Sequence, residues 1–233
     1  ENLPGVNYPL ANESDLSEAK ETIEKHGVKC AIHKGDVRNR NRMSQVVEKT
    51  IKQFGSLDHV VINAGVTQIG MIEHFTDEEV QTVIDINVTG AVRTVQSVVP
   101  IMRKQKSGGI TIISSVVGRQ GAEWFPIYSS TKWAVIGLAK STALIMGKHN
   151  VTCNAIWPTV VKTDLMNNDY VLGGMSPKNP TWSGLEDMMK QWRNPLPMGA
   201  YEPNDIAEIV RYFASKNGKK ITGEVFGVTA GLF

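Results

Sequence analysis

The stretch YSSTK, residues 128–132, lies in an apolar segment whose pattern is typical of an α-helix. Residues four positions apart in an α-helix share one face, one turn from each other. Tyr128 and Lys132 therefore project from the same face, which places a phenol beside an ammonium group. The same spacing is also common on helix surfaces, where a tyrosine merely covers a lysine stem. The rest of the chain must therefore decide between these two interpretations.

The composition is that of one ordinary globular domain. The chain has 233 residues, of which 41% are hydrophobic and 21% charged, with a formal net charge of +2. This balance gives no electrostatic argument for a nucleic-acid or membrane partner. Cys30 and Cys153 are far apart and lack metal-ligand spacing, which favours reduced thiols. With neither a membrane-length apolar run nor a signal peptide in this sequence, we expect a cytoplasmic protein without a metal.

Short apolar runs alternate with longer amphipathic segments along the chain. The runs that predict strands are residues 28–33, 57–62, 110–114, 151–156 and 224–228. The segments that predict helices are residues 15–25, 41–54, 77–104, 126–148 and 204–215, with Asp15 and Glu18 as a loose capping box. The strand candidates are continuously apolar, which indicates burial on both faces. The pattern predicts a single α/β domain over residues 1–233, with a doubly wound parallel sheet flanked by helices.

Residues 166–203 do not follow this alternation of strand and helix patterns. They contain most of the prolines, several glycines and asparagines, Trp182 and Trp192, and one weak helical stretch at residues 185–192. A long irregular insertion in a compact domain is commonly a lid or a binding loop. We therefore expect a substrate-binding lid here, with a packed surface excursion as the alternative.

Small and polar residues follow the predicted strands. Ligands of doubly wound sheets bind beyond the carboxyl ends of the strands, where these residues would gather. Each one alone could be an ordinary turn or cap. The residues are Gly35, Asp36 and Val37, then Asn63, Ala64 and Gly65, then Ser114 and Ser115, and finally Trp157, Pro158 and Thr159.

Taken together and in this order, these residues resemble the short-chain dehydrogenase/reductase family. The matching elements are NAG at residues 63–65, Asn87, Ser115, Tyr128-x-x-x-Lys132, and a proline turn followed by Thr163. The resemblance runs from about Val28 to the C-terminus. It implies a Rossmann-like fold, hydride transfer with NAD (NADP is not excluded), a small alcohol or ketone as substrate, and a homotetramer.

The resemblance also assigns roles to the site residues. A tyrosine normally loses its proton near pH 10, and a neighbouring ammonium lowers that pKa. Tyr128 would therefore act as general acid and base beside Lys132. Ser115 would hold the substrate oxygen, and Asn87 would anchor a water that links Lys132 to solvent. The cofactor-binding residues that the resemblance implies are Asp36, Val37, Asn63, Ala64, Gly65, Tyr128, Lys132, Pro158, Val161 and Thr163.

The opening ENLPGVNYPL departs from the family pattern, because no strand and glycine-rich turn precede the first predicted helix. The missing βαβ start would have roughly 30 to 40 residues. We expect the working protein to be longer, and the residue that separates NAD from NADP to lie in that part. The alternative is a natural variant that binds the nucleotide poorly.

The loop carrying Tyr-Pro-Leu-Ala at residues 8–11 is similar to that of a carveol dehydrogenase-like, mycofactocin-coupled subgroup, in which NAD would be preferred. A loop of separate origin is the alternative.

The predicted substrate pocket lies between residues 115–128 and the lid. Its expected contacts are Ser115, Trp124, Trp157 and Met166. An apolar and adaptable lining suits a hydrophobic secondary alcohol or ketone, of terpenoid or cyclic type. The competing hypothesis is a non-catalytic nucleotide-sensing or assembly subunit that lacks the phosphate loop. Retention of Asn87, Ser115, Tyr128 and Lys132 argues against it.

Overall fold

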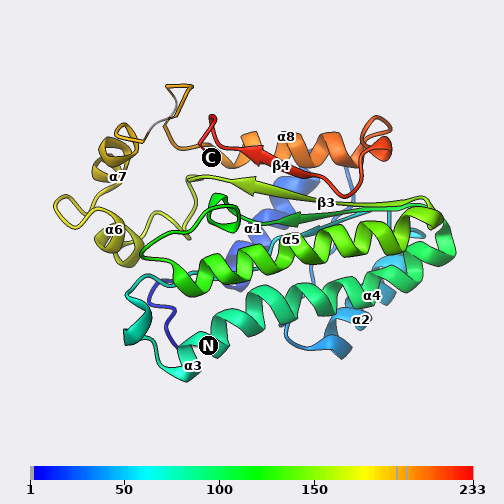
Figure 1. Ribbon diagram of the computed structural model, residues 1–233. Coiled ribbons are helices and arrows are strands. Elements are labelled where there is room, and N and C mark those ends of the chain that lie inside the picture. The colour runs from blue at the N-terminus through cyan, green and yellow to red at the C-terminus, as the bar shows by residue number, and fades with distance from the viewer. Residues whose placement is uncertain (1–2, 193, 198, 233) are drawn as a thin grey trace.

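Four parallel strands form the central sheet. The computed structural model describes residues 3–192, 194–197 and 199–232. The strands β1 (His59–Ile62), β2 (Gly108–Ile113), β3 (Val151–Pro158) and β4 (Val225–Val228) lie side by side in that order. In the register, Ile62 lies opposite Ile112, and Ile112 opposite Ala155. Because all the pairs are parallel, the carboxyl ends of the strands meet at one edge (Figure 1).

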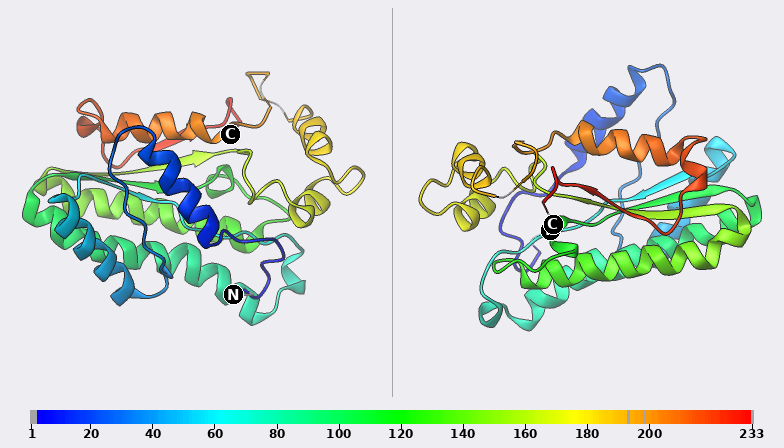
Figure 2. Two further views of the ribbon diagram at one scale, coloured as in Figure 1. Left: turned by 180° about the vertical axis from the view of Figure 1, so that it is seen from behind. Right: turned by 45° about the horizontal axis from the view of Figure 1, so that its top comes forward.

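Helices cover both faces of this sheet, which confirms the predicted doubly wound α/β class. The helices α2 (Arg40–Phe54), α4 (Gly90–Gln105) and α5 (Pro126–Met146) lie on one face, and α8 (Pro203–Ala214) on the other (Figures 1 and 2). The helix α1 (Glu13–Glu24) lies behind the sheet in Figure 1 and buries none of its residues. No helix within the described ranges is both long enough and apolar enough to cross a membrane.

Shorter elements complete the chain. The helices α6 (Asp169–Met175) and α7 (Trp182–Met189) lie at the end of the sheet toward which the strands point (Figure 1). The helix α3 (Asp77–Ile84) precedes a π-helical turn, Asp85–Thr89, that runs into α4. Single 3-10 turns occur at Ile72–His74, Val116–Gly118, Gly147–His149 and Gly218–Lys220.

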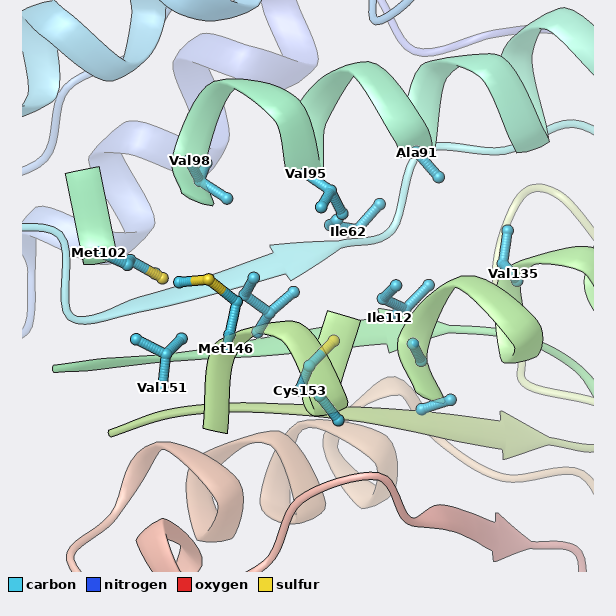
Figure 3. Close-up of a cluster of buried hydrophobic side chains, with 14 of the residues drawn as sticks. Ile62, Ala91, Val95, Val98, Met102, Ile112, Val135, Met146, Val151 and Cys153 are labelled. Atoms are coloured by element: carbon cyan, nitrogen blue, oxygen red, sulfur yellow. The ribbon is translucent and has the colours of Figure 1, made fainter. Parts of the chain in front are cut away.

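The main core fills the space between the sheet and the helices α4 and α5. Every residue of β3 is buried, as the continuously apolar pattern predicts for a central strand. Ile110 and Ile112 of β2 are 0% and 1% exposed. Figure 3 shows Met102 of α4 and Met146 of α5 pointing toward one another above this strand layer. The core thus fixes β2 and α5 relative to each other.

The predicted strand at residues 28–33 is wrong. These residues connect α1 to α2 without strand structure, and Val28 is 54% exposed. A strand requires a partner for its backbone groups, and none of the described strands pairs with this segment. Apolar and β-branched residues supply a preference for extended structure, but the preference does not supply the partner.

Several helix boundaries also differ from the predictions. The predicted single helix at residues 77–104 is divided by the π-helical turn at Asp85–Thr89. The cap of α1 is Asn12, whose side chain accepts from the Ser14 N–H, and Asp15 is the N3 residue of that capping box. The helix at 126–148 ends at Met146 because the next three residues tighten into a 3-10 turn.

The segment 166–203 contains more structure than expected. Besides α7, close to the weak helical stretch predicted at 185–192, it contains α6. Leu172, Leu185 and Met189 form with Val160 a small core of their own. Met166, Met175 and Met188 pack against this small core. Residues 193 and 198 of the predicted lid lie outside the described residues.

We expect Ile112→Ala to destabilise the protein by about 2–5 kcal/mol, because it leaves a cavity against a buried strand. The measurement is the urea dependence of unfolding. The matched control is Ile72→Ala, since Ile72 is 63% exposed; this variant should stay within about 0.5 kcal/mol of the wild type. Equal effects of the two substitutions would contradict this placement of the core.

Candidate active site

Tyr128 and Lys132 lie on one face of the first turns of α5, as their spacing predicts. Pro126 opens this helix at its first position, where the missing N–H costs nothing. The Lys132 Nζ atom lies 5.4 Å from the centroid of the Tyr128 ring. It also donates a 3.0 Å hydrogen bond to the carbonyl oxygen of Ile113, the last residue of β2. The lysine thus connects the tyrosine to the carboxyl end of the sheet.

Two buried serines hold the end of β2 against α5. Ser114 Oγ donates to the carbonyl oxygen of Lys132 at 2.8 Å. Ser129 Oγ donates to the carbonyl oxygen of Val117 at 2.5 Å. Ser115 lies between these two contacts; its Oγ accepts from the Val117 N–H at 3.4 Å, and its proximity to Tyr128 acts to lower the pKa of that phenol. Ser114 and Ser129 therefore position the predicted Ser115–Tyr128 pair, although neither was among the predicted site residues.

Gly118 allows this close approach. A Cβ atom at this position would lie 2.5 Å from Ser114 Oγ and 2.9 Å from the carbonyl oxygen of Lys132. The second neighbour is helix backbone, which cannot move aside without displacing α5. A residue without a side chain is therefore required where the chain after β2 passes α5.

Asn87 lies in the π-helical turn and connects the NAG loop to α5. Its Oδ1 accepts from the Val66 N–H at 2.8 Å, and its Nδ2 donates to the Val66 carbonyl oxygen at 2.9 Å. Nδ2 also donates to Thr131 Oγ1 at 3.0 Å, and Thr131 in turn donates to the carbonyl oxygen of Tyr128 at 2.7 Å. These contacts give Asn87 a positioning role here. Its role as the anchor of a water stays a prediction.

A cavity of about 910 Å³ opens beside these residues. Ten predicted site residues line it: Asn63, Ala64, Gly65, Ser115, Tyr128, Lys132, Pro158, Val161, Thr163 and Met166. The structure therefore brings together most of the predicted site at the carboxyl edge of the sheet. Asn87 lies behind this lining and is 3% exposed.

Asp36 and Val37 do not line the cavity. Asp36 forms an ion pair with Arg38 at 2.6 Å, and the hydrogen bond from Arg38 holds the pKa of this carboxyl below its usual value. Val37 packs beside Gly90, where an added Cβ would lie 2.6 Å from its Cγ2 atom. The loop between α1 and α2 turns both residues toward the start of α4.

Trp157 and Trp124 also lie outside the cavity lining, contrary to their prediction as substrate contacts. The Trp157 indole packs against Gly227, and its Nε1 donates to the Val225 carbonyl oxygen at 3.3 Å. Trp157 lies opposite Gly227 in the register of β3 and β4, so its indole packs across the neighbouring strand. Trp124 is 45% exposed, whereas its neighbour Phe125 contributes to the lining.

The charge states of the pair differ from the sequence-based expectation. Burial raises the pKa of the Tyr128 phenol above its usual value, and the nearby Ser115 side chain acts in the opposite direction. Burial lowers the pKa of the Lys132 amine to about 8. The expected lowering of the Tyr128 pKa by the lysine is therefore wrong for this arrangement, because desolvation of the phenolate dominates.

Two threonine hydroxyls at this site have no hydrogen-bond partner among the described residues. They are the buried Oγ1 atoms of Thr67 and Thr159, and both residues line the cavity. Buried polar atoms without a partner are uncommon in folded proteins. No group of three or more His, Cys, Asp or Glu side chains suited to a metal ion occurs in the described part of the chain.

The comparisons with known proteins agree on one protein family. Residues 6–170 match the family model for short chain dehydrogenases. The (-)-trans-carveol dehydrogenase of Rhodococcus erythropolis is 31% identical over 230 residues, which span 97% of this chain and 83% of the relative. A 3-oxoacyl acyl-carrier-protein reductase of Staphylococcus epidermidis is 31% identical over 98% of this chain and 87% of the relative.

A solved structure has the same fold over nearly the whole chain. It is the crystal structure of carveol dehydrogenase from Mycobacterium avium in complex with NAD, with a TM-score of 0.94 and 30% sequence identity. The match covers 99% of this chain and 84% of that one. The resemblance inferred from NAG, Asn87, Ser115, Tyr128 and Lys132 is thereby confirmed. The chain belongs to the short-chain dehydrogenase family and is an oxidoreductase of that family.

Proposed function

We propose that the protein transfers a hydride between a nicotinamide cofactor and a hydrophobic secondary alcohol or ketone, with Tyr128 as the proton donor and acceptor. One observation carries this proposal. The Tyr128 side chain lines a largely apolar cavity together with Ser115, and has the Lys132 amine beside its ring. An acid–base group, an oxygen-binding hydroxyl and a cation thus meet at one point.

The residues at this edge of the sheet fit a nicotinamide dinucleotide. The NAG loop lines the cavity, and a Cβ at Gly65 would lie 3.2 Å from Asn87 Oδ1 and 3.5 Å from Lys132 Nζ, so glycine leaves the space open there. Pro158, Val161 and Thr163 would hold the cofactor from the opposite wall. The cofactor, when bound, supplies the hydride chemistry. The NAD in the similar Mycobacterium avium structure favours NAD over NADP.

The proton step follows from the charge states. At neutral pH the raised pKa keeps the Tyr128 phenol protonated, so it can donate to a ketone oxygen that Ser115 holds. Each reduction leaves a phenolate at Tyr128, which is stabilised by the Lys132 cation, whose Nζ lies 5.4 Å from the centroid of the ring. Alcohol oxidation uses the same groups in reverse, with the Tyr128 oxygen accepting the proton.

The cavity favours an uncharged, apolar substrate. Most of its lining residues are apolar, the polar ones are neutral side chains such as Gln120 and Ser115, and Lys132 is the one ionisable amine or acid among the described lining residues. A substrate of cyclic or terpenoid type is consistent with the relatives that are named for the cyclic alcohol carveol. We propose residues 166–203 as the lid, because Met166, Met175 and Trp192 close one side of the cavity.

We further propose a homotetramer in the cytoplasm. The outer face of α5 exposes Trp133 (52%), Leu144 (86%) and Ile145 (54%), an unusual set of large apolar side chains for a free surface. Cys30 and Cys153 are free thiols, in keeping with a reducing compartment.

Tyr128→Phe should reduce kcat for oxidation of carveol with NAD by about 100- to 10,000-fold, because it removes the proton-transfer group. The measurement is the absorbance of the reduced nicotinamide, with circular dichroism to verify the fold. Tyr212→Phe is the matched control, since this tyrosine of α8 is 46% exposed. Full activity of the Tyr128 variant would refute the mechanism.

The lowered pKa of Lys132 predicts a pH-dependent stability. Because this pKa is about 8 in the folded chain and 10.5 in the unfolded one, the unfolded chain binds more protons between these values, and stability rises with pH across that window. Relative to Lys132→Met, the wild type should gain up to about 3 kcal/mol from pH 8 to 10.5. Urea unfolding of both proteins measures this. A difference that does not vary with pH would exclude a buried neutral amine.

Leu144→Glu should dissociate the proposed tetramer, because it places a charge in an apolar contact. Native mass spectrometry of wild type and variant measures the subunit count. Lys148→Glu, at an exposed position of the following 3-10 turn, is the control and should leave the count unchanged. A wild-type monomer would rule out this part of the proposal.

A further inference from the structure

The loop at residues 66–70, directly after the NAG sequence, is held by side-chain and backbone groups from distant parts of the chain. Asn87 binds both backbone groups of Val66. The Tyr8 hydroxyl accepts from the Thr67 N–H at 2.9 Å. The Gly70 N–H donates to the Trp124 carbonyl oxygen at 3.1 Å. This loop, the 66–70 loop, therefore connects the cofactor side of the cavity to the segments that carry Tyr8 and Trp124.

Tyr170 of α6 binds the centre of this loop. Its hydroxyl accepts from the Ile69 N–H at 3.1 Å and donates to the Ile69 carbonyl oxygen, also at 3.1 Å. One hydroxyl thus satisfies both backbone groups of a residue that lies 101 positions away in the sequence. Neither the sequence motifs nor the proposed chemistry uses this tyrosine.

The same face of α6 packs closely on the loop. A Cβ added at Gly174 would lie 2.5 Å from Cγ2 of Ile69, so the helix backbone rests directly against that side chain. Met175, the last residue of α6, lines the cavity. The position of α6 on the loop therefore sets the position of the Met175 wall.

Tyr8 supports Tyr170 from the other side. The two rings are stacked, with centroids 6.3 Å apart and an interplanar angle of 23°. Tyr8 is 8% exposed, and its hydroxyl is already bound to Thr67. The Tyr170 ring thus keeps its orientation through stacking, which leaves its hydroxyl as the group that ties α6 to the loop.

We propose that Tyr170 is a positioning residue that couples the substrate side of the cavity to the cofactor side. Its hydroxyl fixes α6, and with it Met175, to the 66–70 loop, whose first residue is held by Asn87. A substrate then binds against an apolar wall that is already formed and whose position relative to the cofactor side of the cavity is fixed. The expected effect on substrate affinity rests on the proposed function, whereas the effect on α6 does not.

The test is Tyr170→Phe, which removes one hydroxyl and keeps the stacked ring. Hydrogen exchange should become faster at the Ile69 amide and along α6 by about 10-fold, because both backbone groups of Ile69 lose their partner. With carveol as the probe alcohol and NAD in excess, KM should rise by about 10-fold while kcat changes much less.

Two controls separate this role from general destabilisation. Tyr8→Phe removes the hydrogen bond to Thr67 and should speed exchange at the Thr67 amide while leaving α6 unaffected. Tyr212→Phe should change neither exchange nor kinetics.

Unchanged exchange in α6 of the Tyr170 variant would overturn the proposal, whatever the kinetics show. Faster exchange together with an unchanged KM would overturn the coupling to substrate. Absence of carveol turnover in the wild type would instead count against the proposed substrate, and the exchange result would still decide the role of Tyr170.

Discussion

The contact between the end of β2 and the first turns of α5 is the constraint on which the site depends. The Ser114 and Ser129 hydroxyls each donate to a backbone carbonyl across this junction, and Gly118 lets the two backbones meet. The main core, which includes Ile112 of β2 and Val135 of α5, holds the same two elements together a few residues away. Ser115, Tyr128 and Lys132 take their relative positions from this junction, so the geometry of the candidate site is a consequence of how a strand meets a helix.

The electrostatics of the pair show how burial and function are linked. Desolvation shifts the pKa values of Tyr128 and Lys132 in opposite directions, and in each case it favours the uncharged form. With its pKa lowered to about 8, Lys132 still carries its proton at neutral pH, beside a neutral phenol. A negative charge that forms nearby stabilises this ammonium further. The site is therefore sensitive to what occupies it.

Sequence patterns predicted the parts of the fold that depend on local periodicity. The strands β2, β3 and β4 and the helices α2, α5 and α8 follow from apolar runs and helical spacing, and Tyr128 and Lys132 meet because four residues make about one turn. The strand predicted at 28–33 was wrong because pairing is not a local property. Trp157 was misplaced because strand position alone does not reveal which face borders the cavity. Ser129 and Tyr170 were not predicted, and Ser114 was named only as a strand-end residue, because the partners of all three are backbone atoms, which leave no sequence signal.

The separate small core of the segment 166–203 has a consequence for altering the enzyme. Leu172, Leu185 and Met189 pack mainly with residues of their own segment and with Val160, not with the layer between β2 and α5. Changes in the volume of this satellite core can reshape the wall that Met166 and Met175 form while the acid–base geometry is kept. The junction at Gly118 has no such tolerance, since one methyl group would already collide with backbone. We therefore expect substitutions in the segment 166–203 to alter the shape of the cavity with less damage to the fold than substitutions at Gly118.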